Sequence, residues 1–415
     1  MGDFVERNVK IIIAAGAAAV VGAVLLAFFL IQGKYLFRSE PVLSKTEITL
    51  EKKPLQSREK QNPEFCRQAL GSDAQKNAYD KLKTVVSYDG SEQFWIDGAD
   101  KNDFQIALTA FLSDYPEVFW IDPASGYSYY EDEDSLAVEL NFTATGEELA
   151  NEKAALDAAV EKAALGAPDN ANDYEVELYL NDYLTENCEY DAQADNKHSA
   201  YGALTGGRAV CDGYSRAFQL LCQRLGIACT VVEGNSEFNT DTEDGHMWNC
   251  VRLGEDWYHV DVTWNDSTHA VCGAEHYFYL NLTTAEITRD HVISGDFSKR
   301  AENRGNFFNI FVPECNSDAL NYMKLNFAEI KDPDDDEQII ATLIAAAREK
   351  QTYCAYLVPD SADFDAVRGN VVDNYAAVWI YTANRFAGNG IKISESTKVV
   401  SYEGKRVLAL QLQYE

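Results

Sequence analysis

The longest uninterrupted apolar run of the chain lies close to its start. Residues 11–31 carry no charged and no polar side chain. As a helix rising about 1.5 Å per residue they would span about 32 Å, close to the ~30 Å hydrocarbon core of a bilayer. A cleaved signal peptide would have a shorter apolar segment of about 7–15 residues and a small-residue cleavage site, which residues 28–32 do not provide. The pattern predicts a transmembrane signal anchor at 11–32, a cytoplasmic tail at 1–10 and an extracytoplasmic body held once in the cell membrane.

The chain after the anchor alternates helix-like and strand-like patterns. Residues 33–62 mix charges, lack long apolar runs and contain prolines, which predicts a stalk or linker. Helical periodicity then covers Phe104–Leu112 and Glu147–Leu165, and a strand-like pattern covers Ser135–Phe142. Residues 63–165 are therefore predicted to form an α+β lead-in domain.

A further helix is expected near the start of the next predicted domain, residues 166–295. It would begin at Asp173, whose side chain can cap the free N–H groups of the first turn. Its apolar stripe consists of Val176, Tyr179, Leu180, Tyr183 and Leu184. A helix with one apolar stripe needs a partner, so this helix is expected to pack against the rest of the domain.

The last part of the chain, residues 296–415, is predicted to form a second flanking α+β domain. A strongly helical run covers Ile339–Arg348, and two strand-like stretches, Ile391–Val400 and Lys405–Tyr414, are joined near Glu403-Gly404. The acidic cluster before the helical run lacks the spacing of an EF-hand loop, so no specific motif supports bound calcium.

One cysteine precedes a helical pattern in the way that a thiol nucleophile requires. The apolar positions of that pattern are Phe218, Leu221, Cys222 and Leu225, and Gly226 can end the helix. Cys211 is therefore predicted at a helix N-terminus, where the helix dipole and free N–H groups stabilise a thiolate and lower the thiol pKa. The backbone N–H of Cys211 is also the expected oxyanion donor.

A predicted β-hairpin carries a histidine and an aspartate that can meet. The sequence indicates a tight turn at Gly254-Glu255, which would pair Leu253 with Asp256. In that register His246 and Asp261 become diagonal neighbours on one face, roughly 7–8 Å apart before their side chains reach toward each other. This geometry lets a carboxylate hold an imidazole.

The three residues suggest a catalytic triad. Cys211 would be the nucleophile, His246 its base and later its acid, and Asp261 the group that fixes the imidazole tautomer. Cys, His and Asp also occur in this order in many proteins without a triad. His259 lies on the same predicted face as Asp261 and is the rival candidate for the base.

Charge and cysteine content narrow the class of protein. The chain has 35 basic and 67 acidic residues, a formal charge of −32, and such a carboxylate excess would repel a phosphate backbone, which argues against nucleic acid as a partner. Nine cysteines are too few for a small disulfide scaffold. The cysteines in apolar surroundings that suit packing are Cys222, Cys229 and Cys250. The cysteines that could include a disulfide, which the sequence cannot pair, are Cys66, Cys188, Cys272, Cys315 and Cys354.

Three sequence blocks resemble the transglutaminase-like superfamily in its bacterial branch. They are a Val-Cys-x-Gly-Tyr-x-x-Ala-Phe block at Val210–Phe218, a Gly-His-x-Trp-Asn block at Gly245–Asn249 and a Trp-Tyr-x-Val-Asp-x-Thr-Trp block at Trp257–Trp264. Their order and intervals are those of the family. The resemblance implies a papain-like α+β core that needs no metal or organic cofactor.

The family's triad falls on Cys211, His246 and Asp261, and the implied reaction is acyl transfer from a peptide or amide bond to the thiol. Trp248, Trp264 and Tyr214 are candidate substrate-binding residues, with core packing as the alternative for the two tryptophans. The sequence thus predicts a membrane-anchored cysteine enzyme that hydrolyses polypeptide or cell-wall peptide. The alternatives are a cross-linking transglutaminase and an inactive surface module for binding or assembly.

Overall fold

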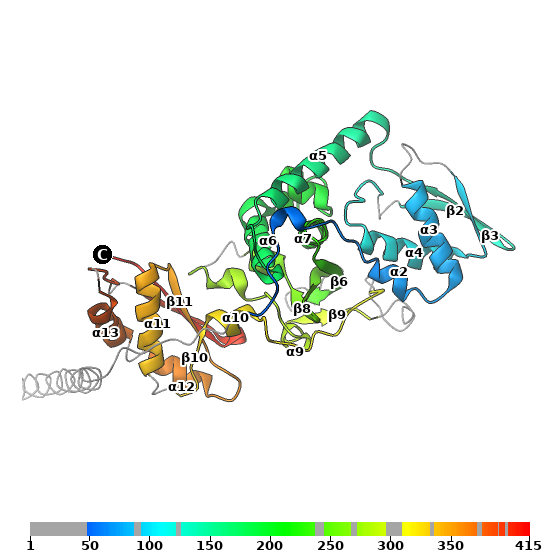
Figure 1. Cartoon of the computed structure of the whole chain (residues 1–415). Helices are drawn as coiled ribbons and strands as arrows, with labels where there is room; N and C mark the ends of the chain where they lie inside the picture. The colour runs from blue at the N-terminus through cyan, green and yellow to red at the C-terminus, as the bar shows by residue number, and fades with distance from the viewer. Residues whose placement is uncertain are drawn as a thin grey trace, which may run out of the picture. The chain divides into compact units, whose positions relative to one another are not determined.

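The structure is a computed structural model that describes residues 48–86, 93–121, 126–236, 245–266, 272–295, 309–332, 336–371, 376–388, 390–394 and 397–415. The chain forms two compact units (Figure 1). The N-terminal unit comprises Glu47–Ala270 and Glu275–Leu325, and the C-terminal unit comprises Val271–Ala274 and Asn326–Glu415. The predicted anchor at 11–32 lies outside the described residues. Within those residues, no helix is both long enough and apolar enough to cross a membrane.

The first part of the N-terminal unit is a small α+β assembly. Its helices are α2 (Phe65–Ala69), α3 (Asp73–Val85) and α4 (Lys101–Asp114). Its antiparallel sheet has the order β1-β3-β2, with strands β1 (Phe94–Asp97), β2 (Tyr127–Asp132) and β3 (Ser135–Leu140). The helix predicted at Phe104–Leu112 and the strand predicted from Ser135 are both confirmed. Helices α3 and α4 and strands β1 and β3 contribute buried side chains to one apolar core, and Tyr127 of β2 packs against it.

The second part of the N-terminal unit packs helices against an antiparallel sheet of order β8-β7-β6-β9. The strands are β6 (Ala228–Ser236), β7 (His246–Leu253), β8 (Asp256–Val260) and β9 (His291–Ile293). The long helices are α5 (Gly146–Leu165), α6 (Asp173–Asn187) and α7 (Cys211–Arg224). The shorter elements are η1 (Leu55–Ser57), β4 (Glu189–Tyr190), η2 (Gly202–Gly206), β5 (Arg208–Ala209), α8 (Val262–Asn265), η4 (Ala274–Tyr277) and α9 (Thr284–Ile287). Helix α7 packs on β6 and β7 (Figure 1), so the mixed α+β fold predicted for the core is confirmed.

The start of α6 differs by one residue from the prediction. Asn172, and not Asp173, is the N-cap: its side chain accepts the N–H of Glu175 at 2.9 Å, and Glu175 in turn accepts the N–H of Asn172 at 2.8 Å. This reciprocal capping box satisfies two N–H groups that the helix leaves open. Asp173 instead pairs with the guanidinium of Arg58 at 2.8 Å.

That ion pair shows that residues 48–62 are not a free stalk, contrary to their place in the linker predicted over 33–62. The Arg58 side chain is almost completely buried, and besides Asp173 it donates to the carbonyls of Ala171 at 2.8 Å and Leu225 at 3.2 Å. The backbone N–H of Lys53 also donates to the Ala171 carbonyl at 3.0 Å. A buried guanidinium requires partners, and here the core supplies them. The segment therefore belongs to the N-terminal unit; the predicted boundaries at 165/166 and 295/296 stay predictions.

A row of polar side chains on α7 links it to α4. The row donates to the last carbonyls of α4: Arg216 Nη1 to Leu112 at 2.6 Å, Gln219 Nε2 to Ser113 at 2.7 Å and Gln223 Nε2 to Asp114 at 3.1 Å. The final carbonyls of a helix have no partner inside the helix. Helix α7 thus caps α4, and the first and second parts of the unit share this polar contact.

The C-terminal unit is a second α+β assembly. Its sheet has the order β10-β11-β13-β12, with strands β10 (Ala328–Glu329), β11 (Tyr353–Leu357), β12 (Lys398–Tyr402) and β13 (Val407–Gln411). Its helices are α10 (Tyr322–Asn326, which begins in the N-terminal unit), α11 (Asp336–Glu349), α12 (Phe364–Arg368) and α13 (Ala376–Ala387), and η7 (Glu403–Lys405) joins the last two strands. The predicted helix and hairpin are confirmed, but β12 begins at Lys398 and not at Ile391. Strand β13 lies between β11 and β12 and buries Ala409 as well as Leu408 and Leu410, so both of its faces are covered.

Candidate active site

Cys211 is the first residue of α7. Val210 before it is extended, and the side chain of Val210 cannot cap the helix. The N–H of Gly213 donates to Oδ1 of Asp212 at 3.1 Å, so the N–H groups of Cys211 and Asp212 are the ones left in the first turn for an anion. All nine cysteines of the chain are described and free, and Cys211 alone among them is not buried. Gly213 permits this geometry, because a Cβ there would lie 2.4 Å from the carbonyl oxygen of Lys197. The structure therefore presents one accessible thiol at a helix N-terminus, as predicted.

His246 is the first residue of β7 and is buried. The predicted register is confirmed, since Leu253 pairs with Asp256. The ring nitrogen Nε2 lies 2.6 Å from Oδ2 of Asp261, and the Cys211 thiol lies close enough to this imidazole to raise its pKa. With Nε2 bonded to Asp261, Nδ1 is the nitrogen left for the thiol. Burial lowers the pKa of His246, but Asp261 and Cys211 together outweigh burial and raise it to about 9.

Asp261 follows β8 and caps the short helix α8. Its Oδ1 accepts the backbone N–H of Trp264 at 3.1 Å, and its Oδ2 lies near two imidazoles, 2.6 Å from His246 and 3.0 Å from His291. The side chain is completely buried. Burial alone would raise the pKa of this carboxyl, yet the two histidines overcome that effect and hold the pKa well below its usual range. Asp261 is therefore a fixed anion between two rings.

His291, the first residue of β9, is a member of this group that the sequence did not indicate. Its Nε2 lies 3.0 Å from Oδ2 of Asp261, and its Nδ1 lies 2.7 Å from Oδ1 of Asp290. Both ring nitrogens face carboxylates, which accept hydrogen bonds, so both must carry protons and the ring is an imidazolium. Burial lowers the pKa of His291, while Asp261 and Asp290 raise it above its ordinary value. No sequence motif marks His291, because β9 has three residues and reaches the site by pairing with distant β6.

The three aromatic residues proposed for the substrate site have different positions. Trp248 is fully buried and donates its indole N–H to Nδ1 of His259 at 3.1 Å. Tyr214 is also fully buried and donates its hydroxyl to Asp266. Both side chains pack in the interior of this structure, and their role in substrate binding stays a prediction. Trp264 alone is half-buried, with its ring centre 5.8 Å from that of His246.

His259, the rival candidate for the base, lies in a different environment. Its Nδ1 accepts the Trp248 indole N–H and contacts the sulfur of Cys250 at 3.2 Å, and its Nε2 lies 3.2 Å from the hydroxyl of Thr284. Both ring nitrogens are thus occupied by residues other than Asp261. The geometry favours His246 as the base.

Two groups of buried side chains in the described residues bring atoms of metal-ligand type within 4.8 Å of one another. One is His246, Asp261 and His291, and the other is Cys250, His259 and Cys315. In the first group the hydrogen bonds to Asp261 account for the approach of both rings. The second group does not include the thiol of Cys211.

Comparison with known proteins identifies the fold of this region. Residues 163–262 match the family model of the transglutaminase-like superfamily. The kyphoscoliosis peptidase of Mus musculus is 31% identical over 94 residues and that of Homo sapiens 39% identical over 94 residues. Each match covers 20% of this chain and 14% of the relative, so the chain spans only a small part of these relatives' length.

Two solved structures are also similar. A proposed cysteine protease from Cytophaga hutchinsonii is 16% identical, with 34% of this chain and 62% of that chain covered and a TM-score of 0.23. A TGase structure is 13% identical, with 43% and 53% covered and a TM-score of 0.26. Over residues 163–262, which the family model matches and which contain the three sequence blocks, this chain is similar to the transglutaminase-like superfamily.

Proposed function

We propose that the protein is a thiol acyl-transfer enzyme that hydrolyses peptide or amide bonds, with Cys211 as nucleophile. The observation that carries the proposal is the position of His246, whose ring contacts the Cys211 thiol on one side and the Asp261 carboxylate at 2.6 Å on the other. A raised pKa of about 9 keeps His246 protonated near neutral pH. An imidazolium beside a thiol at a helix N-terminus favours the thiolate, which is the reactive form.

The chemistry follows from this ion pair. The Cys211 thiolate attacks the carbonyl carbon of the substrate, and the developing oxyanion meets the N–H groups at the start of α7. His246 then gives its proton to the leaving amine, so the C–N bond breaks and a thioester remains. Water loses a proton to His246 and attacks the thioester, which releases the acid and restores the thiol. Asp261 holds the ring of His246 throughout and stays ionised.

The proposal includes water as the acceptor of the acyl group and a place for the enzyme outside the cell. Hydrolysis is favoured because the named relatives with 31% and 39% identity are peptidases. The apolar run at residues 11–31 supports a single-pass anchor with the enzyme outside the cell, where polypeptide or cell-wall peptide would be the substrate. Trp264, half-buried beside His246, is the aromatic side chain best placed to contact that substrate.

The ion pair can be tested without a known substrate. Because Cys211 is the one cysteine of the nine that is not buried, iodoacetamide should label it selectively in the folded protein. Labelling of Cys211, followed by mass spectrometry over a range of pH, should stay fast below neutral pH, because the thiolate is the reactive form. His246→Ala should slow labelling in that range. His259→Gln removes a buried imidazole from the same hairpin and is the matched control, so it should leave the pH profile unchanged. Slow labelling of the wild type below neutral pH, or a profile insensitive to His246, would refute the triad.

The reaction can then be assigned with a panel of peptides in water enriched in ¹⁸O. Hydrolysis would place the heavy oxygen in the new carboxyl group, whereas a cross-linking enzyme would incorporate a labelled primary amine into a glutamine-containing protein. Cys211→Ala should abolish either activity while the protein keeps its fold. A reactive Cys211 with neither product would leave the binding module as the function of this fold.

A further inference from the structure

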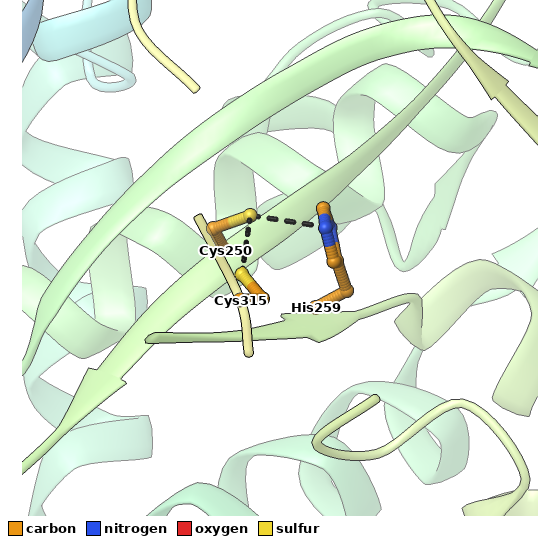
Figure 2. A group of neighbouring side chains, drawn as sticks. All are labelled: Cys250, His259 and Cys315. Atoms are coloured by element: carbon orange, nitrogen blue, oxygen red, sulfur yellow. Dashed lines mark hydrogen bonds between the residues drawn. The ribbon is translucent and has the colours of Figure 1, made fainter. Parts of the chain in front are cut away.

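Two buried thiols and an imidazole form a group that the proposed reaction does not use. The sulfur of Cys250 lies 3.7 Å from that of Cys315 and 3.2 Å from Nδ1 of His259 (Figure 2). Cys250 and His259 are cross-strand partners on β7 and β8, and Cys315 follows 65 residues after Cys250. Both sulfurs belong to fully buried residues. Figure 2 shows the sulfur of Cys250 facing both the sulfur of Cys315 and the ring of His259.

The two thiols are electrostatically unequal. The hydrogen bond from Cys250 is the largest effect on Cys315; together with His259 it outweighs burial and lowers the pKa of Cys315 to about 6. Burial, followed by the hydrogen bond and charge of Cys315, raises the pKa of Cys250 well above its ordinary value. Cys315 is therefore the more acidic thiol of the pair, and the more acidic of two neighbouring thiols is the one expected to attack a disulfide first.

The contacts of His259 argue against a metal at this place. A metal would need the lone pair on Nδ1, which already accepts the Trp248 N–H at 3.1 Å. The other nitrogen, Nε2, lies against Thr284. Structural zinc sites use four ligands, and among the described residues this group supplies only three atoms of ligand type.

We propose that Cys250 and Cys315 are a redox pair that closes to a disulfide by exchange with a small-molecule disulfide such as oxidised glutathione. The Cys315 thiol loses its proton and attacks one sulfur of the oxidant, which displaces a thiolate and forms a mixed disulfide. Cys250 then gives up its proton and attacks the Cys315 sulfur, and the second thiolate leaves. Two thiols of the protein are oxidised, one disulfide is reduced to two thiols, and the protons end on the released thiols.

Closure is geometrically feasible and has a structural consequence. A disulfide needs its sulfurs about 2.05 Å apart, so the two side chains must turn toward each other. The bond would join β7, the strand that begins with His246, to the segment containing Cys315. Because both sulfurs are buried, exchange proceeds in a locally opened or still folding chain. The link restricts the unfolded chain, so oxidised protein should melt at a higher temperature than reduced protein.

The test uses the full chain in a Cys211→Ala background, which removes the accessible thiol, so the outcome is independent of the proposed function. The protein is refolded with excess oxidised glutathione, remaining thiols are trapped with N-ethylmaleimide at acid pH, and an unreduced digest is analysed by mass spectrometry. The expected result is a peptide pair linked through Cys250 and Cys315, together with a Tm several degrees above that of the reduced protein.

Two comparisons make the test decisive. Cys315→Ser should abolish the linked peptides and the redox dependence of Tm. Cys222 and Cys229, another buried pair in which one thiol acts on the pKa of the other, report whether oxidation is selective, and they should stay reduced. The proposal would be overturned if Cys250 and Cys315 were both fully trapped as thiols, or if they paired with other cysteines. It would also be overturned if the protein contained one equivalent of zinc that Cys315→Ser lost.

Discussion

Replacing His291 should change the pKa of His246 although the two side chains do not hydrogen-bond to each other. His291 is a cation because both of its ring nitrogens face carboxylates, Asp261 at 3.0 Å and Asp290 at 2.7 Å. The His246 and His291 ring centres are 5.3 Å apart. Two unit charges at that separation repel by about 3 kcal/mol at an effective dielectric constant of about 20, which corresponds to about two pKa units. His291→Gln removes this charge and keeps a side-chain N–H for Asp261, so the pKa of His246 should rise from about 9 by one to two units.

The measurement is an NMR titration of the imidazole C–H resonances. The chain has six histidines, and the His246 signal is assigned by its loss in His246→Gln. Asp290→Asn should shift the His246 pKa in the same direction, because it removes the carboxylate that holds the second proton on His291. His259→Gln, whose ring nitrogens contact Trp248 and Thr284, should cause no shift.

An unchanged or lowered His246 pKa in a folded His291→Gln protein would refute this reasoning. It would mean that His291 is neutral in the wild type and that one of its ring nitrogens is not protonated. The charge of His291 thus acts directly on the His246 ring, and its removal should raise the pH up to which Cys211 and His246 remain an ion pair. The iodoacetamide profile of Cys211 provides an independent readout of that limit.

Three further changes have definite expected outcomes. Burial raises the pKa of Glu177 to about 8. The protonated Glu177 side chain therefore makes its full contribution to the free energy of unfolding below pH ~4.5, and this contribution is lost as the pH rises through 8. Glu177→Gln should therefore be more stable than wild type at pH 9, by an upper bound of about 5 kcal/mol, and equal to it at pH 4 in urea unfolding. Gly213→Ala places a Cβ 2.4 Å from the Lys197 carbonyl and should cost about 1–3 kcal/mol and slow labelling of the nucleophile. Asp261→Asn removes the anion that holds His246 protonated and should lower the His246 pKa in the same NMR titration; an unchanged value would contradict the ion pair.

The sequence predicted those parts of the site that local chemistry determines. The hairpin register follows from a two-residue turn, since Gly254 adopts a positive φ of 64° and pairs Leu253 with Asp256. The extent of α7 follows from the helical periodicity and from Gly226, whose positive φ of 74° ends the helix. These signals lie within a few residues of the elements that they specify, so the sequence of one protein is enough to predict those elements.

Other features depend on contacts between distant segments and left no local pattern. Asn172 and Asp173 are both good caps, and the choice between them is made by Arg58, which binds Asp173 across 115 positions of sequence. His291 reaches Asp261 because Ser236 pairs with His291 in the β6–β9 ladder. The sequence predicts a packing role for Cys250, because its apolar neighbours are adjacent in the chain. Its contact with Cys315 spans 65 positions and leaves no local pattern.

The polar contact between α7 and α4 connects the lead-in region to the position of the nucleophile. Cys211 and Gln223 lie on the same helix, and twelve residues at about 1.5 Å each place them about 18 Å apart along its axis. A helix of this length moves as one body, so the carbonyls of Ser113 and Asp114, which accept from Gln219 and Gln223, restrain the far end of the element that presents the thiol. The sheet restrains the near end, where the Ser215 hydroxyl lies 2.8 Å from the carbonyl of Met247, next to His246. The α4 contact and the sheet together hold α7, and with it the distance between the Cys211 thiol and the His246 imidazole. A change at the end of α4 can therefore reach the site without contacting it.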